Sequence, residues 1–236
     1  MIPQELKQLN ATFERAHPLE IVRWAVERFR PDVALTSSFG ADSAALIHMA
    51  IQADPAVSIR FVDTGFHFPE TLQFLEDLRR RFHLNVSVFR TTLAAGEIER
   101  LKREHAVRPI DDRYCCGEHK VEATGRALAG LRCWITGLMR EEAPTRRHTP
   151  IVESLENGMT KVAPLAAWTA KQLYAYMQEH RLPFHPLWAR GYTSIGCALH
   201  TQPPVDPNNP RSGRWAGQDK TECGIHDIGK DKRRAK

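Results

Sequence analysis

Apolar residues recur along the chain with two different periods, which predicts helices that alternate with strands. Spacings of three and four residues predict helices over residues 5–29, 44–51, 69–82, 97–104, 119–128 and 169–180. Short apolar runs predict strands at residues 33–36, 57–62, 86–89, 133–136 and 161–165. This alternating order predicts an α/β fold, with a mainly parallel sheet covered by helices on both faces.

The last part of the chain departs from this pattern. Prolines and glycines are frequent between residues 203 and 217, so this stretch has little apolar sequence from which to build a core. No internal repeat and no clear linker come before it. We therefore expect one α/β domain over residues 1–200 and a mobile C-terminal tail over residues 201–236.

Cys223 stands in this tail, within the segment Glu-Cys-Gly-Ile-His at residues 222–226. A mobile segment can carry a thiol into a site and then present it to another protein. A reactive thiol needs partial exposure and nearby positive charge, for which Lys220 and His226 are candidates. Two interpretations stay open on this residue alone: a catalytic cysteine, and a tail cysteine without a role.

Composition narrows the class of protein further. The chain has 236 residues, of which 42% are hydrophobic and 26% are charged, as in ordinary soluble domains. No apolar run approaches the roughly 20 residues that span a membrane, and the N-terminus lacks the pattern of a signal peptide. The five cysteines include the adjacent pair Cys115 and Cys116, which suits metal or redox chemistry better than disulfides. We expect a cytoplasmic protein.

The net charge of +5 is concentrated at the C-terminus. Residues 227–236 hold five basic residues against two acidic ones, which accounts for +3 of the +5. The rest of the chain is near neutral, and no basic stripe with interleaved aromatic residues occurs in it. We therefore expect a solvated tail and no nucleic-acid partner.

The loop after the first predicted strand has the composition of an anion site. Ligands of parallel α/β folds bind beyond the carboxyl ends of the strands, where a following helix offers free N–H groups. Ser37, Ser38 and Ser43 add hydroxyls, and Gly40 lets the backbone approach a ligand. The loop lacks the lysine of a Walker A motif, which excludes the usual triphosphatase interpretation. The alternative is a capped turn without a ligand.

Two further segments follow the carboxyl ends of predicted strands. The second strand ends in Asp63, Thr64 and Gly65. Asp63 either bonds a ribose or base or caps the next turn. Arg140 and Arg146 follow the fourth strand, and their planar guanidinium groups suit a phosphate or sulfate. Solvated surface arginines are the alternative.

Taken together, these segments resemble the assimilatory sulfonucleotide reductases, which reduce adenylyl sulfate or its 3′-phosphorylated form. The segments that carry the resemblance are residues 37–43, 63–65, 68–71, 115–116, 137–146, 191–197, 211–215 and 222–226. The resemblance implies an adenine nucleotide α-hydrolase-like fold. The matching positions imply a substrate site made of Ser37, Ser38, Phe39, Gly40, Asp42, Ser43, Asp63, Thr64, Gly65, Arg140, Arg146 and His226.

The resemblance also implies a mechanism in which the Cys223 thiolate attacks the substrate sulfur. Adenosine phosphate leaves, and Cys223 keeps the sulfite group as a thiosulfonate. A thiol of thioredoxin or glutaredoxin then attacks Cys223 and releases sulfite. Arg140, Arg146 and the loop N–H groups are expected to stabilise the leaving oxygen. The tail is expected to close over the site and reopen for the reductant.

Cysteine usage separates two branches of this family. One branch binds a 4Fe–4S cluster through Cys-Cys and Cys-X-X-Cys pairs and usually takes adenylyl sulfate. The other lacks both pairs and takes the 3′-phosphorylated substrate. This chain keeps Cys115, Cys116 and Cys197, but has His200 at the fourth position. Lys120 stands where the cluster branch has a lysine near the cluster.

Three alternatives for this site stay open. His200 can complete a cluster site with the three cysteines, because imidazole replaces thiolate in some iron–sulfur proteins. The same ligand set is suitable for zinc, although zinc-binding cysteines usually stand two to four residues apart. The third alternative is an empty site. Cys133 lies inside a predicted strand and is expected to be a core residue.

The resemblance favours thioredoxin-dependent reduction of adenylyl sulfate, with other functions as alternatives. The first alternative is a cluster-free 3′-phosphoadenylyl sulfate reductase. An ATP-using adenylating enzyme, or a non-catalytic nucleotide-binding protein on the same scaffold, is a further alternative. Cys223 argues against the last two, because neither needs a thiol in its tail.

Overall fold

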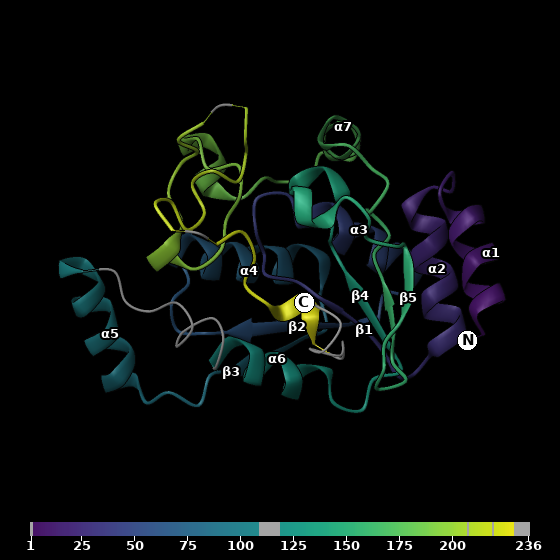
Figure 1. Ribbon diagram of the computed structural model, residues 1–236, viewed down its shortest axis with the longest axis horizontal. Helices are drawn as coiled ribbons and strands as arrows, with labels where there is room; N and C mark the ends of the chain where they lie inside the picture. Colours follow the sequence, from purple (N-terminus) through teal and green to yellow (C-terminus); the bar gives the residue numbers. More distant parts are fainter. Residues whose placement is uncertain (1, 109–118, 207, 219, 229–236) are drawn as a thin grey trace.

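The chain folds around a six-stranded sheet (Figure 1). The computed structural model describes residues 2–108, 119–206, 208–218 and 220–228, so Cys115 and Cys116 lie outside the described residues. The order of the strands in the sheet is β3-β2-β1-β4-β6-β5. The strands are β1 (Val33–Thr36), β2 (Ser58–Asp63), β3 (Val86–Arg90), β4 (Cys133–Thr136), β5 (Val152–Ser154) and β6 (Thr160–Val162).

Pairing within the sheet confirms the predicted, mainly parallel arrangement. β1 pairs in parallel with β2 and with β4, and the pairs β2–β3 and β4–β6 are parallel as well. β5 runs antiparallel to β6 and was not predicted. Its three residues are too few for an alternation of apolar and polar side chains to appear in the sequence.

The helices also follow the prediction, with one correction. They are α1 (Pro3–Phe13), α2 (Pro18–Phe29), α3 (Ala44–Ala53), α4 (Pro69–Phe82), α5 (Ala95–Val107), α6 (Val121–Leu128) and α7 (Ala170–Glu179). The prediction of one helix over residues 5–29 is wrong, because the chain breaks between α1 and α2. His17 is extended there, as residues before a proline usually are, and its ring accepts a hydrogen bond from the N–H of Leu19. Among the helices described, none has the length and apolar character that crossing a membrane requires.

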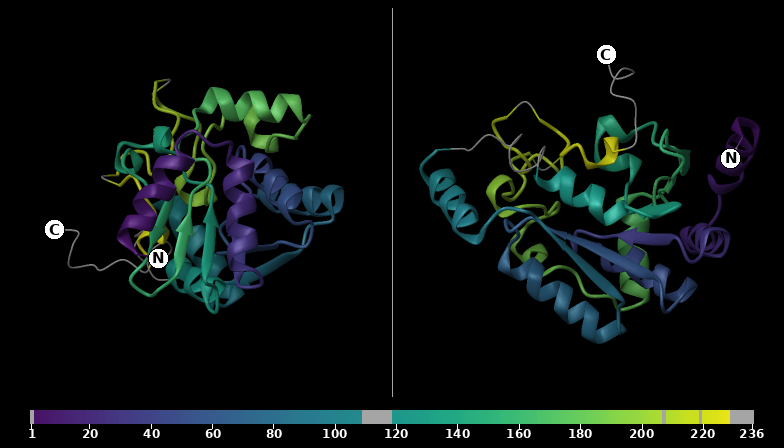
Figure 2. Two further views of the ribbon diagram at one scale, coloured as in Figure 1. Left: turned by 90° about the vertical axis from the view of Figure 1, so that its right-hand side faces the viewer. Right: turned by 90° about the horizontal axis from the view of Figure 1, so that it is seen from below.

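Helices cover both faces of the sheet, as the sequence predicts. α2 packs against α3, and α3 contacts α4 and α7. On the opposite face, α6 packs over β2 and β3 beside the C-terminal segment (Figure 2). Burying a large apolar side chain contributes roughly 1.5–3 kcal/mol to folding. Fully buried members of the core include Leu35, Ile47, Met49, Ile59 and Ile135.

The strand order creates a crevice at the centre of the sheet. The chain moves outward from β1 to β2 and β3, and later places β4 on the other side of β1. The connections that leave β1 and β4 therefore diverge beyond the carboxyl ends of these neighbouring strands. Parallel α/β proteins bind ligands at such a position, and the loop at residues 37–43 begins there.

The C-terminal part packs onto the domain more closely than its composition predicts. Thr201 and Arg214 form an antiparallel bridge, and the Trp215 side chain is only 2% exposed. Gly213 permits this approach, because a Cβ atom at that position would lie 2.0 Å from the carbonyl oxygen of Gln202. The buried indole of Trp215 thus provides apolar contact area that is not expected from a segment rich in proline and glycine. The boundary at residue 200 and the mobility of the tail stay predictions.

Candidate active site

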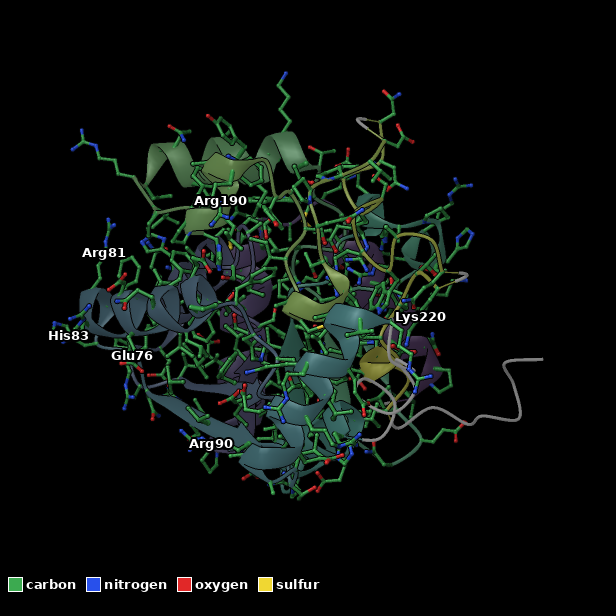
Figure 3. The ribbon with its side chains drawn as sticks, turned by 90° about the vertical axis from the view of Figure 1, so that its left-hand side faces the viewer. Glu76, Arg81, His83, Arg90, Arg190 and Lys220 are labelled. Atoms are coloured by element: carbon green, nitrogen blue, oxygen red, sulfur yellow. The ribbon has the colours of Figure 1, made fainter. Side chains whose placement is uncertain are left out.

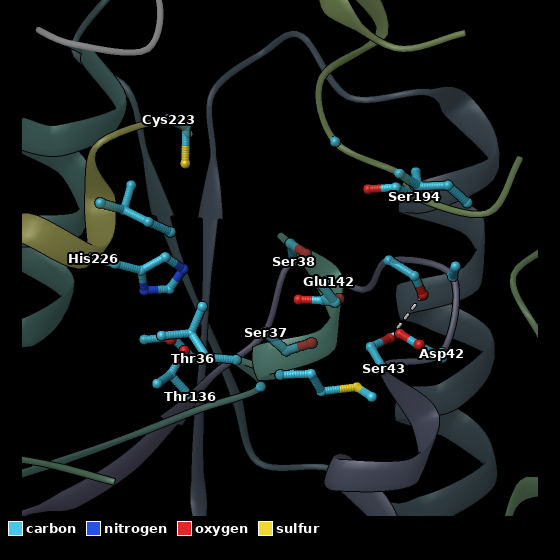
Figure 4. Close-up of a pocket in the computed structure, with 18 of the residues that line it drawn as sticks. Thr36, Ser37, Ser38, Asp42, Ser43, Thr136, Glu142, Ser194, Cys223 and His226 are labelled. Atoms are coloured by element: carbon cyan, nitrogen blue, oxygen red, sulfur yellow. Dashed lines mark hydrogen bonds between the residues drawn. The ribbon is translucent and has the colours of Figure 1, made fainter. Parts of the chain in front are cut away.

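A cavity of about 210 Å³ lies where β1 and β4 end. Its wall includes Thr36 and Thr136, the last residues of these strands, together with Cys223. The volume is several times the roughly 30 Å³ that one water molecule fills, so the cavity can admit a ligand. In Figure 4 the sulfur of Cys223 points into the pocket, and Asp42 and Ser43 lie across from it.

Hydrogen bonds within the loop at residues 37–43 hold its hydroxyls at the cavity wall. The Ser37 hydroxyl accepts the N–H of Phe39 at 3.1 Å, and the Ser43 hydroxyl donates to the Gly40 carbonyl at 3.1 Å (Figure 4). Phe39 is fully buried and packs edge-on against Phe61, so it anchors the loop rather than lining the cavity. The loop residues that line the cavity are Ser37, Ser38, Gly40, Ala41, Asp42 and Ser43.

Asp42 places a half-buried carboxyl group on this wall. Burial, and to a smaller extent the neighbouring Glu142 carboxylate, raises the pKa of Asp42 to about 7. The protonated form of Asp42 is therefore populated near neutral pH, unlike that of an ordinary aspartate. A protonated carboxyl group can donate a hydrogen bond to an oxyanion without repelling it.

The segment at residues 63–65 lies outside the cavity wall and forms a turn. The Asp63 carboxylate accepts the N–H of Gly65 at 2.9 Å, and Thr64 is buried. Gly65 has a φ of 77°, and a Cβ atom there would lie 2.6 Å from the side chain of Ile98. The structure thus gives Asp63 the capping role that the sequence left open, and does not bring this segment into the cavity.

The two candidate arginines occupy different places. Arg146 lines the cavity, and its Nε and Nη2 atoms donate to the Glu222 carboxylate at 2.6 and 2.8 Å. Arg140 is not among the lining residues. Its guanidinium pairs with Glu14 at 3.1 Å and donates to the Thr149 carbonyl at 2.8 Å. The structure therefore brings Arg146, but not Arg140, to the candidate site.

The Cys223 thiol has a nearby cation. The Lys120 ammonium lies 3.7 Å from its sulfur atom. Burial opposes ionisation, but Lys120, the backbone N–H of Ile225 and the Arg214 guanidinium together hold the pKa of Cys223 below its ordinary value. Glu222 acts in the opposite direction. The site therefore favours the thiolate, which is the nucleophilic form of cysteine.

The sequence suggested Lys220 and His226 as the cations near Cys223, but the cation found beside the sulfur is Lys120. The Lys220 ammonium lies 5.5 Å from the centre of the Trp215 ring, at the side of the molecule (Figure 3). His226 lines the cavity and stacks on Trp134 at 5.7 Å. The structure therefore places His226 in the cavity wall.

The cavity also contains cations that sequence analysis did not select. Arg214 reaches it across Gly196, where a Cβ atom would lie 2.2 Å from the guanidinium. Arg211 and Arg214 belong to the segment at 211–215, so the resemblance already contained a signal for them. The ionisable residues on the wall that the predicted substrate site did not include are Arg60, His67, Lys120, Glu142, Arg211, Arg214 and Glu222.

The proposed metal ligands are described only in part. The sulfur of Cys197 and Nδ1 of His200 lie 3.5 Å apart, and the His105 ring packs edge-on against His200. Cys197 and Cys223 pack against the same small apolar cluster around Phe66. Within the described ranges, no group of three or more possible ligands that could hold a metal ion occurs. The two described donors thus lie within hydrogen-bonding distance of each other.

The cavity lies in the crevice between β1 and β4, where parallel α/β folds commonly bind nucleotides. Its oxyanion donors and a thiol of lowered pKa are typical of a nucleotide-binding enzyme that uses a cysteine. Residues 32–203 match the phosphoadenosine phosphosulfate reductase domain. The chain belongs to this family, which confirms the resemblance seen in the sequence. The adenosine 5′-phosphosulfate reductase of Streptomyces coelicolor is 39% identical to it, over 94% of this chain and 95% of that protein.

Solved structures confirm the fold class. The phosphoadenylyl-sulfate reductase of Candida auris, solved as a phosphate complex, superposes with a TM-score of 0.74 at 27% identity. The match covers 86% of this chain and 98% of that one. The FMN adenylyltransferase of Candida glabrata, at 13% identity, shares the fold alone, with a TM-score of 0.58 over 92% and 82% of the two chains. The adenine nucleotide α-hydrolase-like architecture is therefore shown.

Proposed function

We propose that this protein is a cytoplasmic, thioredoxin-dependent reductase that converts adenylyl sulfate to sulfite and AMP in sulfate assimilation. Family membership supports reduction of a sulfonucleotide, and the relative from Streptomyces coelicolor is named for the adenylyl form. The observation that carries the proposal is the 3.7 Å contact between Lys120 and Cys223 at a cavity lined by oxyanion donors.

The reaction follows from the positions of these groups. The Cys223 thiolate forms a bond to the sulfur of adenylyl sulfate, while the bond from that sulfur to the phosphate oxygen breaks. The departing electron pair leaves on AMP, where Arg146 and Arg214 offset the charge that develops. Cys223 then carries a thiosulfonate. One thioredoxin thiolate attacks the sulfur of Cys223 and expels sulfite, and the second thiol releases Cys223 and leaves thioredoxin oxidised.

A 3′-phosphoadenylyl sulfate reductase is the second candidate. The Candida auris enzyme is named for that substrate. It is 27% identical to this chain, and the superposition covers 86% of this chain and 98% of that one. An ATP-using adenylating enzyme is a weaker candidate, because the loop at residues 37–43 has no lysine. A protein that only binds nucleotides has no use for the thiolate that Lys120 favours.

We also propose that Cys115, Cys116, Cys197 and His200 hold a 4Fe–4S cluster, with zinc or no metal as alternatives. The convergence of Cys197 and His200 supports this ligand set. A cluster bound there would supply a charged metal centre on the Cys197 side of the site. The chain's own part is to hold Cys197 and Cys223 against one apolar cluster, with His200 buried beside them.

Replacing the nucleophile tests the proposed reaction. Cys223→Ser should abolish sulfite release while leaving the affinity for adenylyl sulfate within about threefold, because the thiol performs chemistry rather than binding. Sulfite release and equilibrium binding would be measured with reduced thioredoxin present and absent. The matched control is Cys133→Ala, which removes a buried thiol outside the cavity and should keep activity. Sulfite release by Cys223→Ser at the parent rate would exclude the mechanism.

The two arginines of the segment after β4 form a matched pair for a binding test. Arg146→Ala should weaken adenylyl sulfate binding at least roughly tenfold, because a charge-assisted hydrogen bond contributes about 1.5–3 kcal/mol. Arg140→Ala should change the affinity less than about twofold, because its guanidinium engages Glu14 outside the cavity. Isothermal titration calorimetry would measure both. Equal losses in the two variants would contradict this assignment.

Metal analysis tests the proposed ligand set without relying on activity. Anaerobically purified parent protein should contain iron and acid-labile sulfide and absorb visible light. His200→Ala should lose the cluster or release it more easily, whereas His200→Cys should retain it with a lower reduction potential, since thiolate donates more charge than imidazole. Parent protein with neither iron nor zinc at stoichiometric level would exclude a metal site and favour the 3′-phosphorylated substrate.

A further inference from the structure

The Arg146 guanidinium is engaged by two carboxylates from different parts of the chain. Its Nε and Nη2 atoms donate to the two oxygens of Glu222, at 2.6 and 2.8 Å. Its Nη1 atom donates to Glu142, four residues earlier. The Arg146 side chain is 11% exposed, so these contacts lie inside the cavity wall. Each guanidinium nitrogen therefore already has an anionic partner.

The Glu222 carboxylate has the surroundings expected of a bound oxyanion. Besides the bidentate contact with Arg146, it accepts the Thr145 hydroxyl at 3.2 Å and lies 3.5 Å from the Arg211 guanidinium. Burial would raise the pKa of Glu222, but these donors hold the pKa below its ordinary value, so the group is ionised. Carboxylates, sulfates and phosphates bind arginine through the same paired-oxygen geometry.

We propose that Glu222 is an internal ligand of the oxyanion site, which the sulfonucleotide must displace in order to bind Arg146. This inference rests on the proposed function. In the free protein, Glu222 docks the Cys223 segment onto Arg146. When the substrate takes its place, Glu222 leaves Arg146, and residues 220–224 lose this attachment. Docking of Glu222 and substrate binding at Arg146 are therefore mutually exclusive.

A second attachment keeps Cys223 near the cavity during this exchange. His226 stacks on Trp134, its carbonyl accepts the Lys161 ammonium at 3.3 Å, and Ile228 packs against the apolar cluster around Trp134. Gly224, with a φ of 80°, separates this apolar attachment from the ionic one at Glu222. The segment thus has an ionic contact at Glu222 that an anion can replace, and apolar contacts at His226 and Ile228 that an anion cannot replace.

Competition between Glu222 and the substrate for Arg146 lowers the apparent affinity for the substrate. A ligand that binds only the undocked form has its apparent affinity reduced by the fraction of protein in that form. Glu222→Gln removes the charge but keeps the size of the side chain, so it should favour the undocked form. We expect adenylyl sulfate to bind Glu222→Gln about three- to tenfold more tightly than the parent. If Glu222 only positioned Cys223, the affinity would stay unchanged and only turnover would fall.

Hydrogen exchange distinguishes two causes of tighter binding by Glu222→Gln. One is release of the Glu222 segment from Arg146, and the other is only the loss of a negative charge from the cavity. The experiment uses full-length protein with Cys223→Ser, so that adenylyl sulfate binds without turnover, and follows backbone amides by mass spectrometry. Saturating adenylyl sulfate should accelerate exchange in residues 220–224 and leave residues 225–228 unchanged. Glu222→Gln should accelerate the same amides without ligand. The matched control is Glu14→Gln, which breaks a similar arginine–carboxylate pair at Arg140 and should change neither exchange nor affinity.

The outcomes are distinct for the two proposals. Tighter binding by Glu222→Gln, together with ligand-induced exchange at residues 220–224, would support the internal ligand. Unchanged or weaker binding, or slower exchange of these residues with adenylyl sulfate, would overturn it even if the protein forms sulfite. Absence of adenylyl sulfate binding by the Cys223→Ser protein would instead overturn the proposed function. In that case, unchanged exchange at residues 220–224 in ligand-free Glu222→Gln would overturn the docking contact as well.

Discussion

Parallel pairing of β1 with both β2 and β4 is the constraint on which the site depends. It brings the loop after β1 and the segment after β4 to one edge of the sheet. The loop contributes Ser37 and Asp42, and the segment after β4 contributes Arg146. Antiparallel neighbours would send these connections to opposite edges. The Cys223 thiol and the oxyanion donors belong to different parts of the sequence, and they meet where the C-terminal segment packs at this edge of the sheet.

Electrostatic interactions then hold the C-terminal segment at this edge of the sheet. Lys120 and Arg214 offset the cost of burying a thiolate at Cys223. Arg146 and Arg211 hold Glu222, the residue directly before the thiol. Under the proposed function, the cations that would bind a sulfonucleotide therefore also hold the segment that carries Cys223 when no substrate is bound. A partly buried ion pair contributes little net stability when its desolvation is counted, which suits the exchange of Glu222 for substrate that we propose.

The sequence predicted the parts of this arrangement that depend on local pattern. Helical and strand spacing placed the sheet, and the rule on carboxyl ends located the loop that contains Ser37 and Asp42. The sequence did not reveal which of Arg140 and Arg146 lines the cavity. Arg140 is held elsewhere by Glu14, which is 126 residues away in the chain. The Lys120–Cys223 contact joins residues 103 apart and leaves no local signal. Strand β5 was missed because three residues carry no readable period.

In the proposed reaction, Cys223 takes the sulfur of a sulfonucleotide onto its own sulfur atom. Mass spectrometry of the intact protein, incubated with adenylyl sulfate in the absence of any reducing thiol, tests this directly. We expect one added sulfo group per chain, located on the peptide that contains Cys223 and removed by reduced thioredoxin with release of sulfite. An unmodified protein that nevertheless forms AMP and sulfite when thioredoxin is added, or a sulfo group on another residue, would contradict it.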